Sequence, residues 1–81
     1  MAIRWTATAR SDLVRLRNFL AAANPSAAAR AVQRLQGAPK RLLPYHPRLG
    51  VRLPEFSPRE VRRLFVDDYE LRYEIRGNTI L

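Results

Sequence analysis

Apolar residues recur every three or four positions in the first third of the chain. This spacing predicts an amphipathic helix that ends near residue 22. Its apolar stripe comprises Ala9, Leu13, Leu16, Leu20 and Ala23. The hydroxyl of Thr6 or Thr8 can cap the free N–H groups of its first turn. Ahead of this helix, residues 3–6 are predicted to form a short strand with Ile3 and Trp5 on one face.

Asn24 and Pro25 mark the start of a second predicted helix. Asparagine is a favoured N-cap, and proline at the first helical position loses no hydrogen bond. Gly37 and Pro39 are expected to break or kink this helix, with a last turn over residues 40–43. The short link between the two helices predicts an antiparallel hairpin. The apolar side of the second helix comprises Ala28, Val32 and Leu35.

The second half of the chain changes to the two-residue period of β-strands. Predicted strands cover residues 51–53, 60–66, 69–76 and 79–81. Predicted turns lie at Ser57-Pro58, Asp67-Asp68 and Gly77-Asn78. The alternation over residues 69–76 is unbroken, which predicts a strand with one buried face and one solvated face.

These elements predict an α+β fold with the order β-α-α-β-β-β and a single domain over residues 1–81. The antiparallel two-helix hairpin is expected to pack on one face of a mainly antiparallel sheet, because the helical stripe and the apolar sheet face must bury each other. A chain of this length buries only about 60–65% of its unfolded surface, so its stability is expected to be thin. A partner that binds the folded state would add to it.

The chain is strongly basic, with a net charge of +8. Lys40 is the only lysine, so arginine supplies nearly all of the positive charge. Arginine pairs with phosphate and with carboxylate in a bidentate way, which favours a nucleic acid or an acidic protein as partner. The alternative is a solvated surface in which the arginines have no specific partner. Charge alone does not separate these possibilities.

Residue chemistry excludes several kinds of site. Without cysteine there are no disulfides and no thiolate metal sites, and His46 alone cannot build a zinc site, so no metal and no cofactor are predicted. The sequence has no glycine-rich phosphate loop and no recognisable pairing of nucleophile and base. The Asp67-Asp68 pair is expected to form a turn, and His46 to be an exposed loop residue. No signal peptide or transmembrane stretch is found, so the expected location is the cytoplasm.

Arg62 and Arg63 are adjacent on a predicted strand and must point to opposite faces of the sheet. One of them therefore lies on or beside an apolar face, where a guanidinium usually pairs with an acid. The candidate acids are Glu55, Glu60 and Glu74. The alternative is a phosphate-binding site formed with Arg72, which could stabilise charge on a scissile phosphate. Both interpretations stay open at this point.

The order of these segments resembles the RelE/ParE toxin superfamily, and within it the ParE-like toxins of type II toxin–antitoxin systems. The likeness spans nearly the whole chain. The matching stretches are Ile3-Arg4-Trp5-Thr6 with Ala9 and Asp12-Leu13, Asn24-Pro25 with Ala28, Leu43 with Pro47-Arg48-Leu49-Gly50, Val61-Arg62-Arg63-Leu64, and Tyr69-Glu70-Leu71-Arg72-Tyr73-Glu74-Ile75.

The resemblance implies a bacterial protein-binding toxin that is not itself an enzyme. ParE-like toxins inhibit DNA gyrase and are neutralised by a ParD-like antitoxin, whose C-terminal segment wraps the toxin in a hetero-oligomeric complex. Direct sequence-specific DNA binding is not expected, because the sequence has no recognition-helix signature. The residues expected to bind the antitoxin are Leu13, Leu16, Leu20, Val32, Leu35, Arg62, Arg63 and Tyr73.

Two alternative functions follow from the same features. RelE-like members cut messenger RNA on the ribosome, and for such an activity Arg62 and Arg72 would be the phosphate ligands. The lysines that RelE-like members carry near the second strand are absent, which weakens this interpretation. The second alternative is a basic nucleic-acid-binding module with salt-dependent affinity for DNA. Family members usually continue the last strand past the position of Leu81, a departure that bears more on toxicity than on antitoxin binding.

Overall fold

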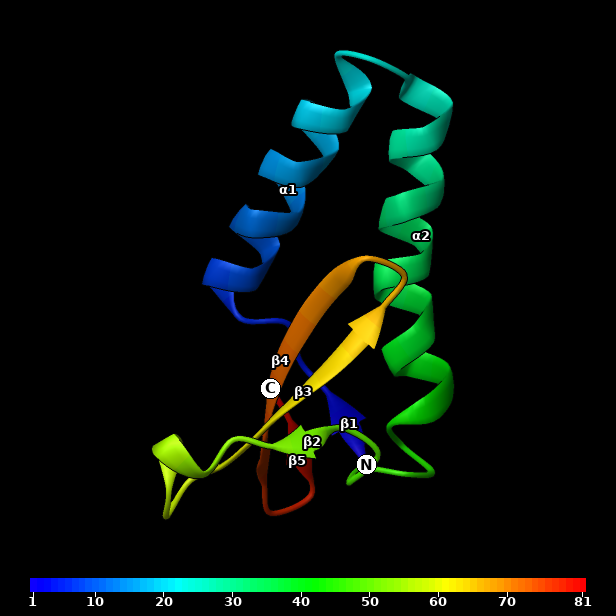
Figure 1. The fold of residues 1–81 in the computed structure, drawn as a ribbon. Coiled ribbons are helices and arrows are strands. Elements are labelled where there is room, and N and C mark those ends of the chain that lie inside the picture. The colour runs from blue at the N-terminus through cyan, green and yellow to red at the C-terminus, as the bar shows by residue number, and fades with distance from the viewer.

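A five-stranded sheet and a two-helix hairpin make up the computed structural model, which describes residues 1–81 (Figure 1). The strands are β1 (Ala2–Ile3), β2 (Val51–Arg52), β3 (Glu60–Val66), β4 (Tyr69–Arg76) and β5 (Thr79–Ile80). The helices are α1 (Ala7–Ala21) and α2 (Pro25–Leu42), and a short 3-10 turn, η1, covers Pro54–Phe56. The predicted α+β class and order of elements are confirmed. Neither helix has the length and apolar character needed to cross a membrane.

The sheet brings the two ends of the chain together. Its strand order is β1-β5-β4-β3-β2, with β1 parallel to β5 and every other pair antiparallel. Ile3 is therefore paired with Ile80 at one side of the sheet. Strand β1 is shorter than the predicted strand over residues 3–6, because β5 ends at Ile80 and Trp5 has no neighbouring strand beside it.

Both predicted hairpin turns are confirmed. Asp67 and Gly77 each adopt a left-handed backbone, with φ of 54° and 58°. Two-residue hairpin loops need this conformation, which glycine adopts freely and aspartate tolerates. Arg34 of α2 also pairs with Asp67 at 2.6 Å, and so ties the tip of the β3–β4 hairpin to the helical layer.

Helix α1 is only partly covered by the rest of the protein. Thr6 caps it as predicted, accepting from the Ala9 N–H at 3.0 Å. The helix packs along α2, whereas α2 is the helix that contacts the sheet. None of the α1 residues is fully buried, and its apolar stripe, including Leu13 and Leu16, is only half-buried. The expected burial of this stripe against the sheet is thus incomplete.

Helix α2 runs unbroken to Leu42, so the predicted break at Gly37 or Pro39 is wrong. Pro39 lies in the last turn of the helix, where a missing N–H costs one hydrogen bond, and its ring is buried. The Pro39 carbonyl still accepts from the Leu43 N–H at 2.9 Å. Asn24 caps the start of the helix, as predicted, by accepting from Ala27.

The core is small and lies where the end of α2 meets the sheet. Leu43, Tyr73 and Ile80 form its buried centre, and partly buried apolar residues of β1, β3 and β4 surround them. Alternation along β4 points Tyr73 inward, and the pairing of β4 with β5 sets Ile80 opposite Ile75. The apolar surface buried at this one point carries much of the fold's stability.

We expect Leu43→Ala to lower the free energy of unfolding by about 2–5 kcal/mol, because it leaves a cavity beside Tyr73 and Ile80. Chemical denaturation of the purified chain measures this. Leu49→Ala is the matched control, since Leu49 is 49% exposed, and it should change stability by less than about 0.5 kcal/mol. Equal losses in the two variants would contradict a core centred on Leu43.

Candidate functional site

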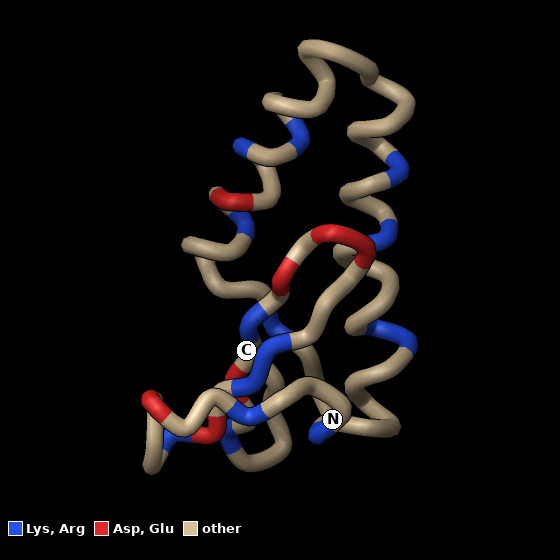
Figure 2. Tube along the Cα trace, viewed as in Figure 1, with Lys and Arg blue, Asp and Glu red and all other residues tan.

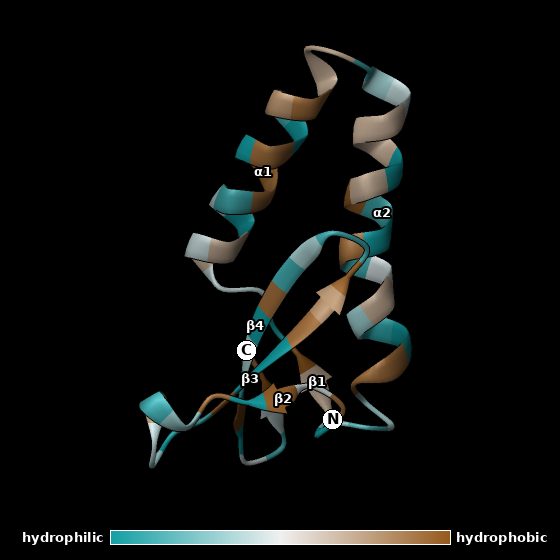
Figure 3. Ribbon diagram, in the orientation of Figure 1, coloured by the Kyte–Doolittle hydropathy of each residue, from teal (hydrophilic) through white to brown (hydrophobic).

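An apolar groove opens where α1 separates from the sheet. The two helices meet at the closed end of their hairpin and spread apart toward the strands (Figure 1). The groove encloses about 450 Å³, and 13 of its 20 lining residues are hydrophobic. Leu13 and Leu16 of α1 form one wall, and Tyr69 and Leu71 of β4 form another. Figure 3 shows apolar residues of α1 on the side that faces α2.

The structure brings together half of the residues predicted to bind a partner. Those that line the groove are Leu13, Leu16, Leu35 and Tyr73. Leu35 and Tyr73 are 3% and 6% exposed, so they form its floor rather than an accessible wall. Leu20 and Val32 are half-buried and do not line it.

Sequence reasoning missed the part of the groove that the segment after β1 and the start of β4 provide. Trp5 lies in the groove together with Arg4, Tyr69 and Leu71. The alternation of Ile3 and Trp5 was a usable signal, since it predicted that both residues share one face. The position of Trp5 beyond the end of β5 was not readable, because it depends on which strands pair.

Charged residues border the groove. Arg4 lines both the groove and a second hollow that adjoins it at Trp5, where Arg10 also lies, and Asp12 and Glu70 lie in the groove itself. Elsewhere Asp67 and Asp68 lie at the tip of the β3–β4 hairpin, the other acidic residues (Glu55, Glu60 and Glu74) lie toward the opposite end of the sheet, and basic residues are spread over both helices and the sheet (Figure 2). The groove is therefore apolar inside and mixed in charge at its border.

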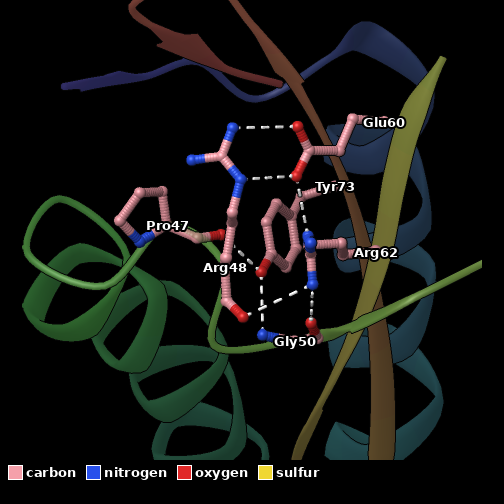
Figure 4. A network of polar contacts seen from close by, with 6 residues as sticks. All are labelled: Pro47, Arg48, Gly50, Glu60, Arg62 and Tyr73. Atoms are coloured by element: carbon pink, nitrogen blue, oxygen red, sulfur yellow. Dashed lines mark hydrogen bonds and ion pairs between the residues drawn. The ribbon is translucent and has the colours of Figure 1, made fainter.

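Tyr73 also holds a polar network that fastens the loop before β2 to the sheet (Figure 4). Its hydroxyl donates to the Pro47 carbonyl at 2.8 Å and accepts from the Gly50 N–H at 2.9 Å. Burial of this hydroxyl is the main cause that raises the pKa of Tyr73 above its ordinary value. At neutral pH the phenol is accordingly uncharged and serves as both donor and acceptor.

Arg62 belongs to the same network. Its side chain is 15% exposed, and its guanidinium donates to Glu60 at 2.9 Å and to the Gly50 carbonyl at 2.7 Å. The hydrogen bond from Arg62 is the main cause that lowers the pKa of Glu60, and Arg48 contributes to it as well. The predicted pairing of an arginine with Glu60 is confirmed. The Arg62 guanidinium therefore already donates its hydrogen bonds to acceptors within the protein.

Arg63 and Arg72 lie on the opposite face of the sheet from Arg62. They are paired across β3 and β4, and both approach Glu70, at 3.7 and 2.8 Å. The Arg63 guanidinium also lies over the exposed Phe65 ring, 5.5 Å from its centroid. The structure thus does not bring the three arginines together. The predicted split of Arg62 and Arg63 between two faces is confirmed.

Glu74 anchors a second group of ion pairs on that face. It accepts hydrogen bonds from Arg59, at 2.7 Å, and from Arg76, at 3.1 Å. These bonds, led by the one from Arg59, lower the pKa of Glu74 to about 2.

No group of three or more His, Asp or Glu side chains is placed to hold a metal ion, and His46 is exposed. The apolar groove between α1 and β4 is suited to binding an apolar segment of a partner.

The comparisons with known proteins point to one family. The family model described as the ParE toxin of the type II toxin–antitoxin system, parDE, matches residues 3–81. No curated protein matches the chain.

We expect Tyr73→Phe to lower the free energy of unfolding by about 1–3 kcal/mol, because it leaves the Gly50 N–H and the Pro47 carbonyl without their partner. Chemical denaturation measures the loss. Tyr45→Phe is the matched control: it removes the same hydroxyl from a residue that is 79% exposed, and should leave stability unchanged. Similar losses in both variants would rule out a structural role for the Tyr73 hydroxyl.

The ion pairs of Glu74 predict an acid-dependent loss of stability. Its pKa is about 2 in the folded state and about 4.3 in an unfolded chain, so the unfolded state binds more protons as the pH falls. The stabilisation is complete above about pH 4.3 and is lost toward pH 2. In Glu74→Gln this contribution is absent, so the stability difference from the wild type should shrink over that range in urea unfolding curves. Glu55→Gln, which removes a carboxylate that forms no ion pair, is the matched control.

Proposed function

The chain belongs to the ParE toxin family of type II toxin–antitoxin systems, and we propose that it inhibits DNA gyrase and is neutralised by a ParD-like antitoxin. The family makes the chain the toxin component, with an antitoxin as its partner. The observation that supports the antitoxin part of the proposal is the apolar groove between α1 and β4. Since gyrase acts on chromosomal DNA, the proposed location is the bacterial cytoplasm.

The apolar surface of α1 that remains in contact with water provides a driving force for binding a partner in the groove. Leu13 and Leu16 are only half-buried, on a helix with no fully buried residue. Covering them removes their remaining apolar surface from water, and each Å² of apolar surface buried contributes about 25 cal/mol. A partner in the groove would stabilise the folded chain by the same interaction. Neutralisation and stabilisation of the toxin are then one event.

The charge of the helices suits an acidic antitoxin. Several cations have no ion-pair partner within the chain: Arg4, Arg10, Arg17, Arg30, Lys40, Arg41 and Arg52. Complementary charge raises the rate of association and selects the partner, while the apolar groove supplies affinity. An antitoxin segment with acidic residues flanking an apolar core meets both requirements.

The arginines support a non-enzymatic mode of action. A phosphate-cleaving site needs cations that converge on one point. Here Arg62 binds Glu60 and a carbonyl on one face of the sheet, while Arg63 and Arg72 share Glu70 on the other. This separation favours inhibition of gyrase by binding over a RelE-like cleavage of messenger RNA.

The test uses the purified chain, the small protein encoded beside it, and a DNA supercoiling assay with purified gyrase. We expect the chain to inhibit supercoiling and the neighbouring protein to restore it. Leu16→Glu should weaken antitoxin binding by about tenfold or more, because it places a charge in the apolar groove. Val14→Glu, at an α1 residue that is 48% exposed and outside the groove, is the matched control.

Two results would contradict the proposal. Unimpaired supercoiling together with cleavage of ribosome-bound messages would replace gyrase inhibition by a ribonuclease activity. If no protein encoded beside the chain co-purifies with it, the antitoxin part of the proposal is wrong. Circular dichroism of each variant confirms that it is folded before its binding is measured.

A further inference from the structure

The face of the sheet that points away from the helices carries an exposed patch. Tyr73 points toward the core at the end of α2, so by alternation Arg63 and Phe65 of β3 point the other way. Val51 of β2 and Arg72 of β4 lie opposite Arg63 on its two sides. Val51 and Phe65 are each 62% exposed. We call Val51, Arg63, Phe65 and Arg72 the Arg63 patch.

Arg63 is the one arginine of this face that forms no hydrogen bond within the protein. The other arginines, Arg59, Arg72 and Arg76, each donate to a glutamate, at 2.7, 2.8 and 3.1 Å. Arg63 approaches Glu70 only to 3.7 Å, beyond hydrogen-bond range, and its buried Nε has no acceptor. It also lies directly opposite Arg72, a placement of like charges that destabilises a sheet. The fold therefore gains no hydrogen bond from this guanidinium.

The Phe65 ring holds the Arg63 guanidinium in position. The guanidinium lies over the ring, 5.5 Å from its centroid, which is a favourable cation–π arrangement. The Arg63 side chain is 42% exposed, so part of its guanidinium faces solvent. A stacked, planar guanidinium is pre-organised to bind a carboxylate. The Arg63 patch thus presents a positioned and unsatisfied cation between two exposed apolar side chains.

We propose that the Arg63 patch binds the protein target of the toxin, through a carboxylate that is flanked by apolar side chains. This inference rests on the proposed function, because it assigns the surface that contacts the target. One carboxylate matches the one unpaired guanidinium, and its apolar neighbours cover Val51 and Phe65. Arginine and aromatic side chains supply much of the binding energy at protein interfaces, and a charged hydrogen bond strengthens where apolar groups exclude water.

A nucleic acid fits this face less well than an acidic protein. Its regularly spaced phosphates require several free cations, and Arg63 is the only one here. Glu70 and Glu74 lie among the arginines of the face and would repel phosphates. Most cations without an ion pair lie instead on the helices, and Arg52 of β2 points to the helix-facing side with Arg62.

A second copy of the chain would meet its own charge on this face. The face carries four arginines and two glutamates, a net charge of +2, so pairing it with itself brings excess positive charge together. Both glutamates already accept hydrogen bonds from arginines of their own chain. Neither is therefore free to pair with Arg63 of a second copy.

The Arg63 patch and the apolar groove meet at β4. Arg72 belongs to the patch and also lines the groove. An antitoxin in the groove therefore reaches the border of the patch and can hinder the target without covering Arg63. The two surfaces should nevertheless be separable by mutation, with Leu16 required for the antitoxin and Phe65 for the target.

The first test measures the concentration of each variant that half-inhibits gyrase supercoiling. Arg63→Glu reverses the charge of the patch and Phe65→Ser removes its aromatic side chain, and each should raise this concentration by about tenfold or more. Arg30→Glu makes the same charge change on an exposed part of α2, and Phe19→Ser removes a ring that is 76% exposed on α1. Both controls should change the concentration by less than about threefold.

Two measurements on the same variants separate target binding from folding and from the antitoxin. Each variant should keep its thermal unfolding midpoint within about 4 °C of the wild type, because exposed side chains contribute little to stability. Phe65→Ser should bind the antitoxin within about threefold of the wild type.

A second test does not depend on gyrase. A synthetic peptide with the core Leu-Glu-Phe is titrated into the ¹⁵N-labelled chain, and a Leu-Gln-Phe peptide of the same shape without the charge is the control. We expect the acidic peptide to shift the Arg63 Nε–H signal and the amide signals of Val51 and Phe65. The control peptide should bind about tenfold more weakly.

The outcomes distinguish this inference from the proposed function. If the wild type inhibits gyrase and Arg63→Glu and Phe65→Ser inhibit equally well, the proposed function stands and the patch is wrong. If the wild type does not inhibit gyrase, the peptide decides. Carboxylate-dependent shifts at Arg63 then support the patch and reject gyrase as the target. Shifts confined to Leu13 and Leu16, or none at about 10 mM peptide, overturn the patch.

Two further results would assign the face to another occupant and overturn the inference. The first is binding of a labelled single-stranded oligonucleotide that Arg63→Glu abolishes while gyrase inhibition is unchanged. The second is a dimer in sedimentation experiments that Phe65→Ser dissociates, which indicates a second copy.

Discussion

The buried side chain of Tyr73 is the interaction on which the rest of the structure depends. Its ring lies in the core with Leu43 and Ile80, and its hydroxyl binds the backbone of Pro47 and Gly50. A side chain at Gly50 would meet the Tyr73 hydroxyl at 2.8 Å and the Arg63 carbonyl at 2.5 Å, so only glycine allows the loop to approach this closely. The approach of the loop in turn gives Arg62 its carbonyl acceptor and positions β2 beside β3.

The position of this core also explains the groove. The largest buried cluster lies at the end of α2, and the residues that α2 buries nearer to α1 include the small side chains of Ala28 and Ala31, so the leucines of α1 stay only half-buried. The thin core and the binding groove are thus two consequences of one distribution of apolar residues. A toxin that must be held by a partner is served by such a surface, since the partner adds stability where the chain lacks it.

The same β3–β4 register that builds the core divides the charges between two faces. Glu60 and Arg62 lie on the helix-facing side with Tyr73, and Arg63, Glu70, Arg72 and Glu74 lie on the other. Each acid is shared by two arginines, which spreads the positive charge along the sheet without focusing it on one point. This arrangement is consistent with a binding protein whose arginines maintain its own structure.

Local chemistry was readable in the sequence by itself. The caps at Thr6 and Asn24, the turns at Asp67 and Gly77, and the alternation along β4 each depend on neighbouring residues, and all were predicted. So was the acid that pairs with Arg62, as one of three candidates, because two adjacent strand residues must face opposite sides. Three features were decided only by the tertiary structure: the unbroken α2, which needs a buried place for the Pro39 ring, the incomplete covering of α1, and the meeting of Trp5 with Tyr69 and Leu71 in the groove. Each follows from which segments meet in space, and hydrophobic periodicity carries no information about that.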